Sequence, residues 1–232
     1  MPSSQSVATV PRTLGVLMLD TRFPRPPGDI GNPASFDFPV RYAVVRGASP
    51  RRVVQDHDAA LLRPFIEASR ALVREGADAI TTSCGFLILF QDALQDALGV
   101  PVWSSSLLLV APLAAALPTG RSVGIVTVDA ASLGAAHLRA AGASPETPIE
   151  GLAVGSAFQR CLLDDEPTLD FDAARRATVD AARTLMARRP DVAALVLECT
   201  NMPPYAAAVR EATGLPVHDI TTLLASRFAA RS

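Results

Sequence analysis

Residues 195–220, LVLECTNMPPYAAAVREATGLPVHDI, decide the fold, because they repeat the layout of residues 79–105, AITTSCGFLILFQDALQDALGVPVWSS. In both stretches an apolar strand ends at a cysteine turn, and a helix, a glycine and a second strand follow. Cys84 and Cys199 each lie 15 residues before that glycine. The residues from the glycine onward also match, GVPVWSSSLLL against GLPVHDITTLL. This agreement predicts an internal duplication.

The starts of the two copies agree as well. LGVLMLD, at residues 14–20, has a glycine five residues before its aspartate, and VGIVTVD, at residues 123–129, has the same spacing. Each copy is predicted to contain a strand, a helix, a strand, the cysteine turn, a helix, a strand and a helix. The strands are short runs of Val, Ile, Leu and Ala, which are typical of parallel strands buried on both faces. The predicted fold class is α/β, with two similar parallel-sheet domains related by a pseudo-twofold axis and the active site in the cleft between them.

Helices are predicted at residues 58–75, 86–98, 173–188 and 205–213, and the domain boundary is expected near residues 112–119. Gly99 and Gly214 are expected to cap the helices that precede them. The segment of residues 24–39 follows the first strand and is rich in Pro, Gly and Asp. It is either a lid over the cleft that carries specificity or a plain long loop.

Composition excludes several classes of protein. The 232 residues are 49% hydrophobic and 19% charged, with a net charge of −2, and no basic run could follow a phosphate backbone. We therefore expect no nucleic-acid partner. The apolar run of residues 107–117 is broken by Pro112 and is shorter than the roughly 20 residues that span a bilayer, so no membrane segment is expected. The N-terminus lacks the basic start of a secretory signal, which favours a cytoplasmic location.

The basic residues and the cysteines restrict the chemistry. All 21 basic residues are arginines, which excludes Schiff-base chemistry and a lysine-anchored pyridoxal phosphate. The three cysteines are an odd number without a C-x-x-C pair, so free thiols are expected rather than disulfides or a zinc site. We expect no cofactor and no metal.

The positions of Cys84 and Cys199 predict a reaction. Each closes a strand and precedes a helix, where unpaired backbone N–H groups lower a thiol pKa from about 8.5 toward neutrality. Neighbouring hydroxyl and amide side chains could hold a substrate carboxylate; these are Thr81, Thr82, Ser83, Thr200 and Asn201. A thiolate and a thiol on opposite faces of the adjacent carbon could remove a proton from one side and return it on the other. The prediction is racemisation without a cofactor.

With these motifs the chain resembles the aspartate/glutamate/hydantoin racemase superfamily, the cofactor-independent two-cysteine racemases, which also includes maleate cis-trans isomerase and arylmalonate decarboxylase. ECTNMP is similar to the family's Gly-Cys-Thr-His-Tyr-Pro, which places Cys199 and Thr200 on the second catalytic cysteine and its threonine. Cys84 falls on the first cysteine, usually written Cys-Asn-Thr. Asp20 and Thr21 fall on the Asp-Ser turn after the first strand.

The resemblance implies a first domain of residues 1–112 and a second of residues 113–219, with a C-terminal helix of about residues 220–232 returning to the first. It also implies a possible homodimer and a small carboxylate substrate. Catalysis is assigned to Cys84 and Cys199. Substrate binding is assigned to Asp20, Thr21, Asn32, Ser83, Gly85, Phe86, Thr200 and Asn201.

The chain also departs from the family motifs. Gly85 and Phe86 replace the Asn-Thr that helps to bind the amino acid, and Asn201 stands where glutamate racemases carry histidine and aspartate racemases carry glutamate. These departures leave amino acids, hydantoins and other small carboxylates as possible substrates. Keeping both cysteines argues against the decarboxylase branch.

Three functions are weighed. The favoured one is a racemase or epimerase, an isomerase that acts next to a carboxylate or carbonyl by two-cysteine acid/base catalysis. The second is a cis-trans isomerase similar to maleate isomerase, in which a cysteine adds covalently to the substrate. The third is a non-catalytic two-lobed protein that binds a small ligand, which would have no need for reactive thiols.

The remaining candidates have structural interpretations. Cys161 lies on an apolar helical face and is expected in the core. His57 and His137 are expected inside helices and exposed to solvent, whereas His218 is expected to pack. Asp20 is either a site residue or an N-cap, and Asp129, its counterpart in the second copy, is interpreted as a cap.

Overall fold

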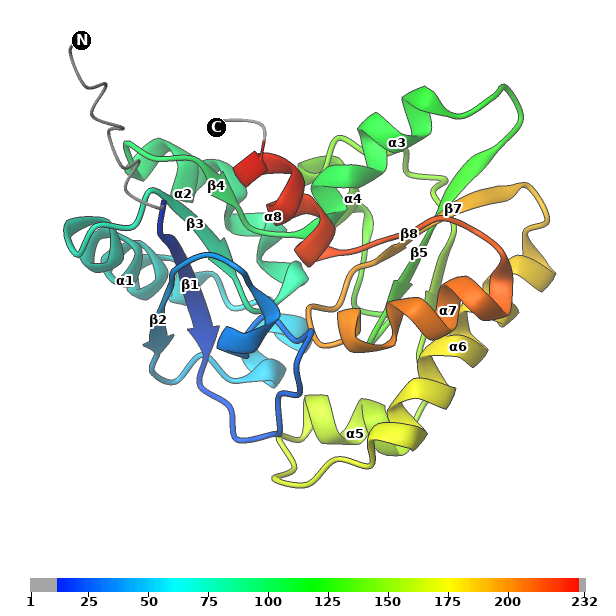
Figure 1. Ribbon diagram of the computed structural model, residues 1–232, viewed down its shortest axis with the longest axis horizontal. Coiled ribbons are helices and arrows are strands. Elements are labelled where there is room, and N and C mark those ends of the chain that lie inside the picture. The colour runs from blue at the N-terminus through cyan, green and yellow to red at the C-terminus, as the bar shows by residue number, and fades with distance from the viewer. Residues whose placement is uncertain (1–11, 230–232) are drawn as a thin grey trace, which may run out of the picture.

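The computed structural model describes residues 12–229 and contains two parallel four-stranded sheets (Figure 1). The first sheet has the order β2-β1-β3-β4 and the second the order β6-β5-β7-β8. These orders are identical when each strand is replaced by its counterpart, which confirms the α/β class and the duplication. The strands are β1 (Leu14–Leu19), β2 (Val40–Val45), β3 (Ala79–Thr82), β4 (Val102–Trp103), β5 (Ser122–Thr127), β6 (Ile149–Gly151), β7 (Val192–Leu197) and β8 (Val217–His218).

Helices cover the sheets and link their strands. The α-helices are α1 (Leu62–Arg74), α2 (Gln91–Ala97), α3 (Val110–Ala116), α4 (Ala135–Ala140), α5 (Ala157–Leu163), α6 (Phe171–Arg188), α7 (Ala206–Thr213) and α8 (Ile220–Ala229). Short 3₁₀ helices span Pro33–Ser35, Ala59–Leu61, Gly85–Phe90, Ser106–Leu109 and Pro203–Tyr205, and Arg51–Gln55 forms one π-helical turn. Among the residues that the structure describes, none of these helices is long and apolar enough to cross a membrane.

The matched glycines of the two copies have the same packing role. A Cβ atom on Gly15, in β1, would lie 2.6 Å from Ile80 and 3.1 Å from Leu72 of α1. A Cβ atom on Gly124, in β5, would lie 2.7 Å from Leu185 of α6. Both glycines therefore allow a leucine of the covering helix to pack directly on the central strand, because a larger residue would overpack the core.

The structure corrects several sequence predictions about local elements. Each copy contains a fourth strand, β2 or β6, that the sequence analysis missed. β2 is a half-exposed edge strand and β6 has three residues, so neither shows the continuous apolar run of a central strand. The helix predicted at residues 86–98 is divided into the 3₁₀ helix Gly85–Phe90 and α2. Gly214 caps α7 with a φ of 69°, but α2 ends at an extended Leu98 and Gly99 is no such cap.

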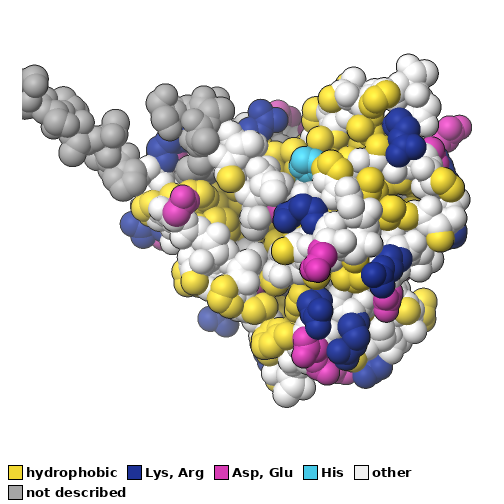
Figure 2. Space-filling view, turned by 45° about the vertical axis from the view of Figure 1, so that its right-hand side comes forward, with side chains coloured by type: hydrophobic (Ala, Val, Ile, Leu, Met, Phe, Trp, Pro, Cys, Tyr) yellow, Lys and Arg dark blue, Asp and Glu magenta, His cyan; other side chains and the backbone are white. Residues whose placement is uncertain are grey.

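The two halves share buried contacts. The main hydrophobic cluster joins residues of both sheets, among them Leu17 of β1 and Leu197 of β7. The last helix, α8, places Ile220, Leu223 and Leu224 in a second cluster with residues of β1 and β3 (Figure 1). The two cysteine turns, at the ends of β3 and β7, therefore meet inside one packed body. On the outer surface, basic and acidic side chains are mixed on the face that Figure 2 shows.

Candidate active site

Both predicted catalytic cysteines line one cavity between the two halves. Cys84 follows β3 and Cys199 follows β7, so both lie at carboxyl ends of parallel strands. The polar part of the wall is formed by Ser83, Cys84, Glu198, Cys199, Thr200 and Asn201. The apolar part includes Leu19, Phe23, Val54, Phe86, Val128 and Leu162. The cavity is narrow and partly open to the surface, and Cys84 in its wall is only partly buried.

The predicted lowering of the thiol pKa values is wrong for both cysteines. Burial is the largest effect and raises the pKa of Cys84 and of Cys199 well above the usual range, and the nearby charge of Glu198 raises both further. The elements that directly follow the two turns are short 3₁₀ helices, Gly85–Phe90 and Pro203–Tyr205, whose aligned dipoles are smaller than that of an α-helix of several turns. Desolvation of the sulfur therefore outweighs the nearby N–H groups.

The two thiols differ in the groups that support ionisation. The backbone N–H groups of Phe86 and Leu87 and the charge of Arg25 lower the pKa of Cys84, against the stronger effect of burial. Cys199 has only the backbone N–H of Asn201 in its favour, and its own S–H donates to Asn201 Oδ1 at 3.5 Å. Of the two sulfurs, that of Cys84 is the better placed to become a thiolate.

Glu198 is the site residue that sequence reasoning missed. Its side chain is completely buried, and one carboxylate oxygen, Oε2, accepts a hydrogen bond of 2.6 Å from Thr127 Oγ1. The other oxygen, Oε1, has no partner. Burial raises the pKa of Glu198 to about 7, although the Thr127 hydrogen bond lowers it. The signal in the sequence was a charged residue directly after the buried run LVL and before a cysteine, where an apolar residue is expected.

The predicted hydroxyl groups mainly connect the backbone of the site. Thr200 Oγ1 donates to the carbonyl of Ser83 at 2.6 Å, and Ser83 Oγ accepts from the backbone N–H of Leu19 at 2.8 Å. The hydroxyls of Thr81 and Thr82 donate to the carbonyls of Trp103 and Ser104 at 2.7 Å each. Ser83 and Thr200 still line the cavity, whereas Thr81 and Thr82 do not. The Thr200 bond joins the two cysteine turns, and the other bonds fix the first turn within its own half.

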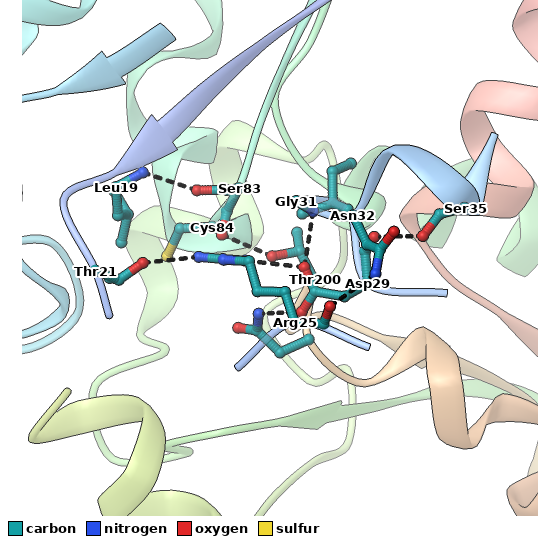
Figure 3. A network of polar contacts seen from close by, with 12 residues as sticks. Leu19, Thr21, Arg25, Asp29, Gly31, Asn32, Ser35, Ser83, Cys84 and Thr200 are labelled. Carbon is teal, nitrogen blue, oxygen red and sulfur yellow. Dashed lines mark hydrogen bonds and ion pairs between the residues drawn. The ribbon is translucent and has the colours of Figure 1, made fainter. Parts of the chain in front are cut away.

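The segment of residues 24–39 joins the first half to the second beside the cavity. Figure 3 shows Arg25 and Asp29 of this segment next to Thr200 and Cys84. Asp29 accepts hydrogen bonds from Asn201 Nδ2 at 2.6 Å and from Arg25 at 2.9 Å. The guanidinium of Arg25 lies 4.5 Å from the ring centre of Phe23, a residue of the cavity wall. The segment is therefore held to the Cys199 turn by a buried, charged contact.

Three predicted binding residues lie outside the cavity wall. Asp20 is exposed and accepts from the backbone N–H of Gly47 at 3.0 Å. Thr21 accepts from Arg25 at 3.0 Å. Asn32 caps the 3₁₀ helix Pro33–Ser35 and donates to the carbonyl of Arg25 at 2.8 Å. They shape the segment that carries Arg25, and contact between them and a substrate stays a prediction. Gly85, Phe86 and Asn201 line the cavity as predicted.

The expectation that His57 and His137 lie in helices and are exposed holds only in part, because His57 is exposed but not helical and His137 is helical but not exposed. His137 belongs to α4 but is buried, with its ring 5.1 Å from Phe86 and 4.9 Å from His57. His57 lies outside the helices with a φ of 46°. Burial and the neighbouring His57 lower the pKa of His137 to about 4, so it is a neutral packing group behind the cavity wall. Cys161 is buried in the core, as predicted. Within residues 12–229, no group of three or more His, Cys, Asp or Glu side chains could hold a metal ion.

Comparison with known proteins identifies the family. No protein-family model matches the chain. The chain is 34% identical over 89% of its length to a dimethylsulfoniopropionate lyase of Durusdinium sp. clade D, and covers 71% of that protein. It belongs to the dimethylsulfoniopropionate lyase family. Dimethylsulfoniopropionate lyase 7 of Emiliania huxleyi is 32% identical over 94% of the chain, with 67% of the relative covered. Dimethylsulfoniopropionate lyase 2 of the same organism is 28% identical over 91% of the chain, and the match covers 70% of that relative.

Solved structures confirm the resemblance to the racemase superfamily at the level of the fold. Unliganded arylmalonate decarboxylase superposes with a TM-score of 0.63 at 17% identity, covering 95% of this chain and 94% of the decarboxylase. Allantoin racemase from Pseudomonas fluorescens superposes with a TM-score of 0.59 at 17% identity, and the match covers 94% of this chain and 89% of the racemase. Glutamate racemase from Bacillus anthracis superposes with a TM-score of 0.55 at 14% identity, and the match covers 95% of this chain and 83% of the racemase.

The predicted racemase or isomerase function is therefore wrong. The sequence relatives over about nine tenths of this chain are lyases, and the racemases share only its fold at low identity. The error came from treating the two-cysteine cavity as specific for racemisation. The same cavity can support another reaction that begins by removing a proton, and what happens next depends on the surrounding residues.

Proposed function

We propose that this protein is a lyase that cleaves dimethylsulfoniopropionate. The proposal rests on 34% identity to a dimethylsulfoniopropionate lyase over 89% of the chain. It is supported by a cavity in which a cysteine could act as a base. The substrate is a small zwitterion, with a carboxylate at one end and a dimethylsulfonium group at the other. This agrees with the predicted class of small carboxylates.

The reaction follows from the chemistry of that substrate. A base removes a proton from the carbon next to the carboxylate, and the electron pair of the broken C–H bond forms a carbon–carbon double bond. The C–S bond on the next carbon breaks, and its electron pair leaves with dimethyl sulfide, so that acrylate remains. The leaving group is already a sulfonium and needs no further activation. A positioned base is the main catalytic requirement.

We assign the base to Cys84. The N–H groups of Phe86 and Leu87 and the charge of Arg25 favour its thiolate, whereas Cys199 donates its S–H to Asn201. Elimination returns no proton to the carbon, so a second acid on the opposite face is unnecessary. Phe23 and Phe86 provide apolar wall against which the two methyl groups of the sulfonium can pack. The segment of residues 24–39 lies beside the cavity, where Asp29 holds Asn201 of the wall, and we expect this contact to influence substrate entry.

Incubation of the purified protein with dimethylsulfoniopropionate tests this function. We expect equal amounts of dimethyl sulfide, measured by gas chromatography, and acrylate, measured by proton NMR. The double variant Cys84→Ser/Cys199→Ser is the control for spontaneous elimination. Product formation no faster than in that control would overturn the proposed function.

A further inference from the structure

The carboxylate of Glu198 has an arrangement that packing alone does not explain. It enters the cavity wall from the end of β7, and its Oε2 is held by Thr127 of β5. Its Oε1 is buried and has no hydrogen-bond partner. A Cβ atom on Gly85, the residue after Cys84, would collide with this same Oε1. An unpartnered carboxylate oxygen inside a protein is strongly unfavourable, so the position indicates a group that exchanges a proton.

Within residues 12–229, no cationic side chain forms an ion pair with Glu198. Thr127 faces it from β5, Gly85 and Cys84 face it from the first half, and Cys199 follows it in the chain. Its own backbone carbonyl accepts from Ser106 Oγ at 3.4 Å. Among the described residues, no salt bridge involves Glu198; Arg25 pairs with Asp29 instead. The titratable neighbours of Glu198 are therefore the two thiols.

We propose that Glu198 accepts the proton of the Cys84 thiol, so that the cavity holds one negative charge shared between the carboxylate and the thiolate. The proton leaves Cys84 Sγ, where the electron pair of the S–H bond stays, and is taken up by Glu198 Oε1, which lines the same cavity and has no hydrogen-bond partner before the transfer. The carboxylate becomes a carboxylic acid, and no other reactant is required. Glu198 is thus a positioning residue that acts through Cys84.

The electrostatics of the cavity disfavour two negative charges at the same time. The charge of Glu198 raises the pKa of Cys84, which means that a carboxylate and a thiolate disfavour each other at this distance. Burial raises the pKa of Glu198 to about 7, toward that of an ordinary thiol, although burial raises the pKa of Cys84 as well. The N–H groups of Phe86 and Leu87 compensate part of the charge when it resides on sulfur. The pair titrates as a unit rather than as two separate groups.

The role in turnover rests on the proposed function, but proton sharing does not. In the elimination, the thiolate takes the proton of the substrate and becomes a thiol again. The proton held by Glu198 is then released to solvent, so each turnover yields dimethyl sulfide, acrylate and one proton. Replacing Glu198 by an uncharged residue should lower kcat more than it raises KM.

Ionisation of Cys84 can be measured without any substrate. The ultraviolet absorbance of the thiolate would be recorded from about pH 5 to about pH 11, as the difference between each protein and the same protein carrying Cys84→Ser. We expect two steps, one near the pKa of Glu198 and one in the alkaline range. Glu198→Gln keeps the acceptor for Thr127 but cannot take the proton, so it should show only the alkaline step. Asp219→Asn removes another buried carboxylate, one that caps α8 outside the cavity, and should keep both steps.

The outcomes separate this inference from the proposed function. An early step that persists in Glu198→Gln, or is missing from the unmodified protein, would overturn proton sharing even if dimethyl sulfide is formed. Two steps in a protein that forms no dimethyl sulfide would support proton sharing and overturn the lyase function. A merely structural role would lower the melting temperature of Glu198→Gln and leave both steps in place. If the lyase function holds, Glu198→Gln should lower kcat at neutral pH about 100-fold, the lower end of the range for general acid–base catalysis.

Discussion

The two cysteine turns occupy equivalent places in the duplicated fold but have different neighbours. The first reads Ser83-Cys84-Gly85-Phe86 and the second Glu198-Cys199-Thr200-Asn201. Two contacts join the turns, and each one brings the residue before one cysteine against the residue after the other cysteine. Thr200 donates to the carbonyl of Ser83, and Gly85 leaves the space that Glu198 fills. The backbone kept the symmetry of the duplication, whereas the side chains lost it. An elimination that uses one face of its substrate needs only one base.

The largest expected effect compares the two cysteines. If Cys84 is the base, Cys84→Ser should lower kcat for dimethylsulfoniopropionate by about 10²–10⁴-fold, the range for general acid–base catalysis. Cys199→Ser keeps a hydroxyl that can donate to Asn201 and should lose clearly less activity. Steady-state rates of dimethyl sulfide release measure both variants. The reverse order would contradict the assignment of the base to Cys84.

The second prediction concerns the pH dependence of stability. Burial raises the pKa of Glu198 from 4.5 to about 7, so its contribution is most favourable below the unfolded value and is lost as the pH rises through about 7. Between about pH 4 and pH 8, the free energy of unfolding should fall by about 3 kcal/mol more in the unmodified protein than in Glu198→Gln. Urea denaturation at several pH values measures this difference. Parallel curves for the two proteins would show that Glu198 ionises normally.

A third prediction tests the crossed contacts. A Cβ atom at residue 85 would lie 2.5 Å from the backbone carbonyl of Glu198, which cannot move away easily. Gly85→Ala should therefore destabilise the protein by about 1–3 kcal/mol through overpacking. Thr200→Ala, at the equivalent place of the other turn, removes a hydrogen bond without adding volume.

Thermal denaturation and the two-step titration of Cys84 distinguish these variants. Gly85→Ala should also displace Glu198 and alter the early step of the titration. Thr200→Ala should leave that step in place. An unchanged early step in Gly85→Ala would show that its Cβ atom does not move the carboxylate.

The smallest expected effect concerns the contact between the second turn and the segment of residues 24–39. Asn201→Ala removes the 2.6 Å hydrogen bond to Asp29, while Arg25 and Gly31 still hold that carboxylate. One hydrogen bond to a charged group contributes about 1.5–3 kcal/mol when buried, and part of this loss should appear as a KM raised several-fold. Michaelis–Menten kinetics measure it. A lowered kcat with an unchanged KM would mean that Asn201 acts on the chemistry rather than on substrate entry.

The sequence by itself determined the duplication, the α/β class and the meeting of two cysteine turns, because strand periodicity, glycine spacing and turn residues are local signals that repeat along the chain. Only the tertiary structure decided the chemistry of the site. Whether Cys84 is exposed to the field of a helix or buried beside Glu198 depends on residues more than 100 positions apart in the sequence. The pairing of Gly85 with Glu198 likewise exists only after the halves have packed. Burial and long-range charge control pKa values, and neither can be predicted from the neighbours of a residue along the chain.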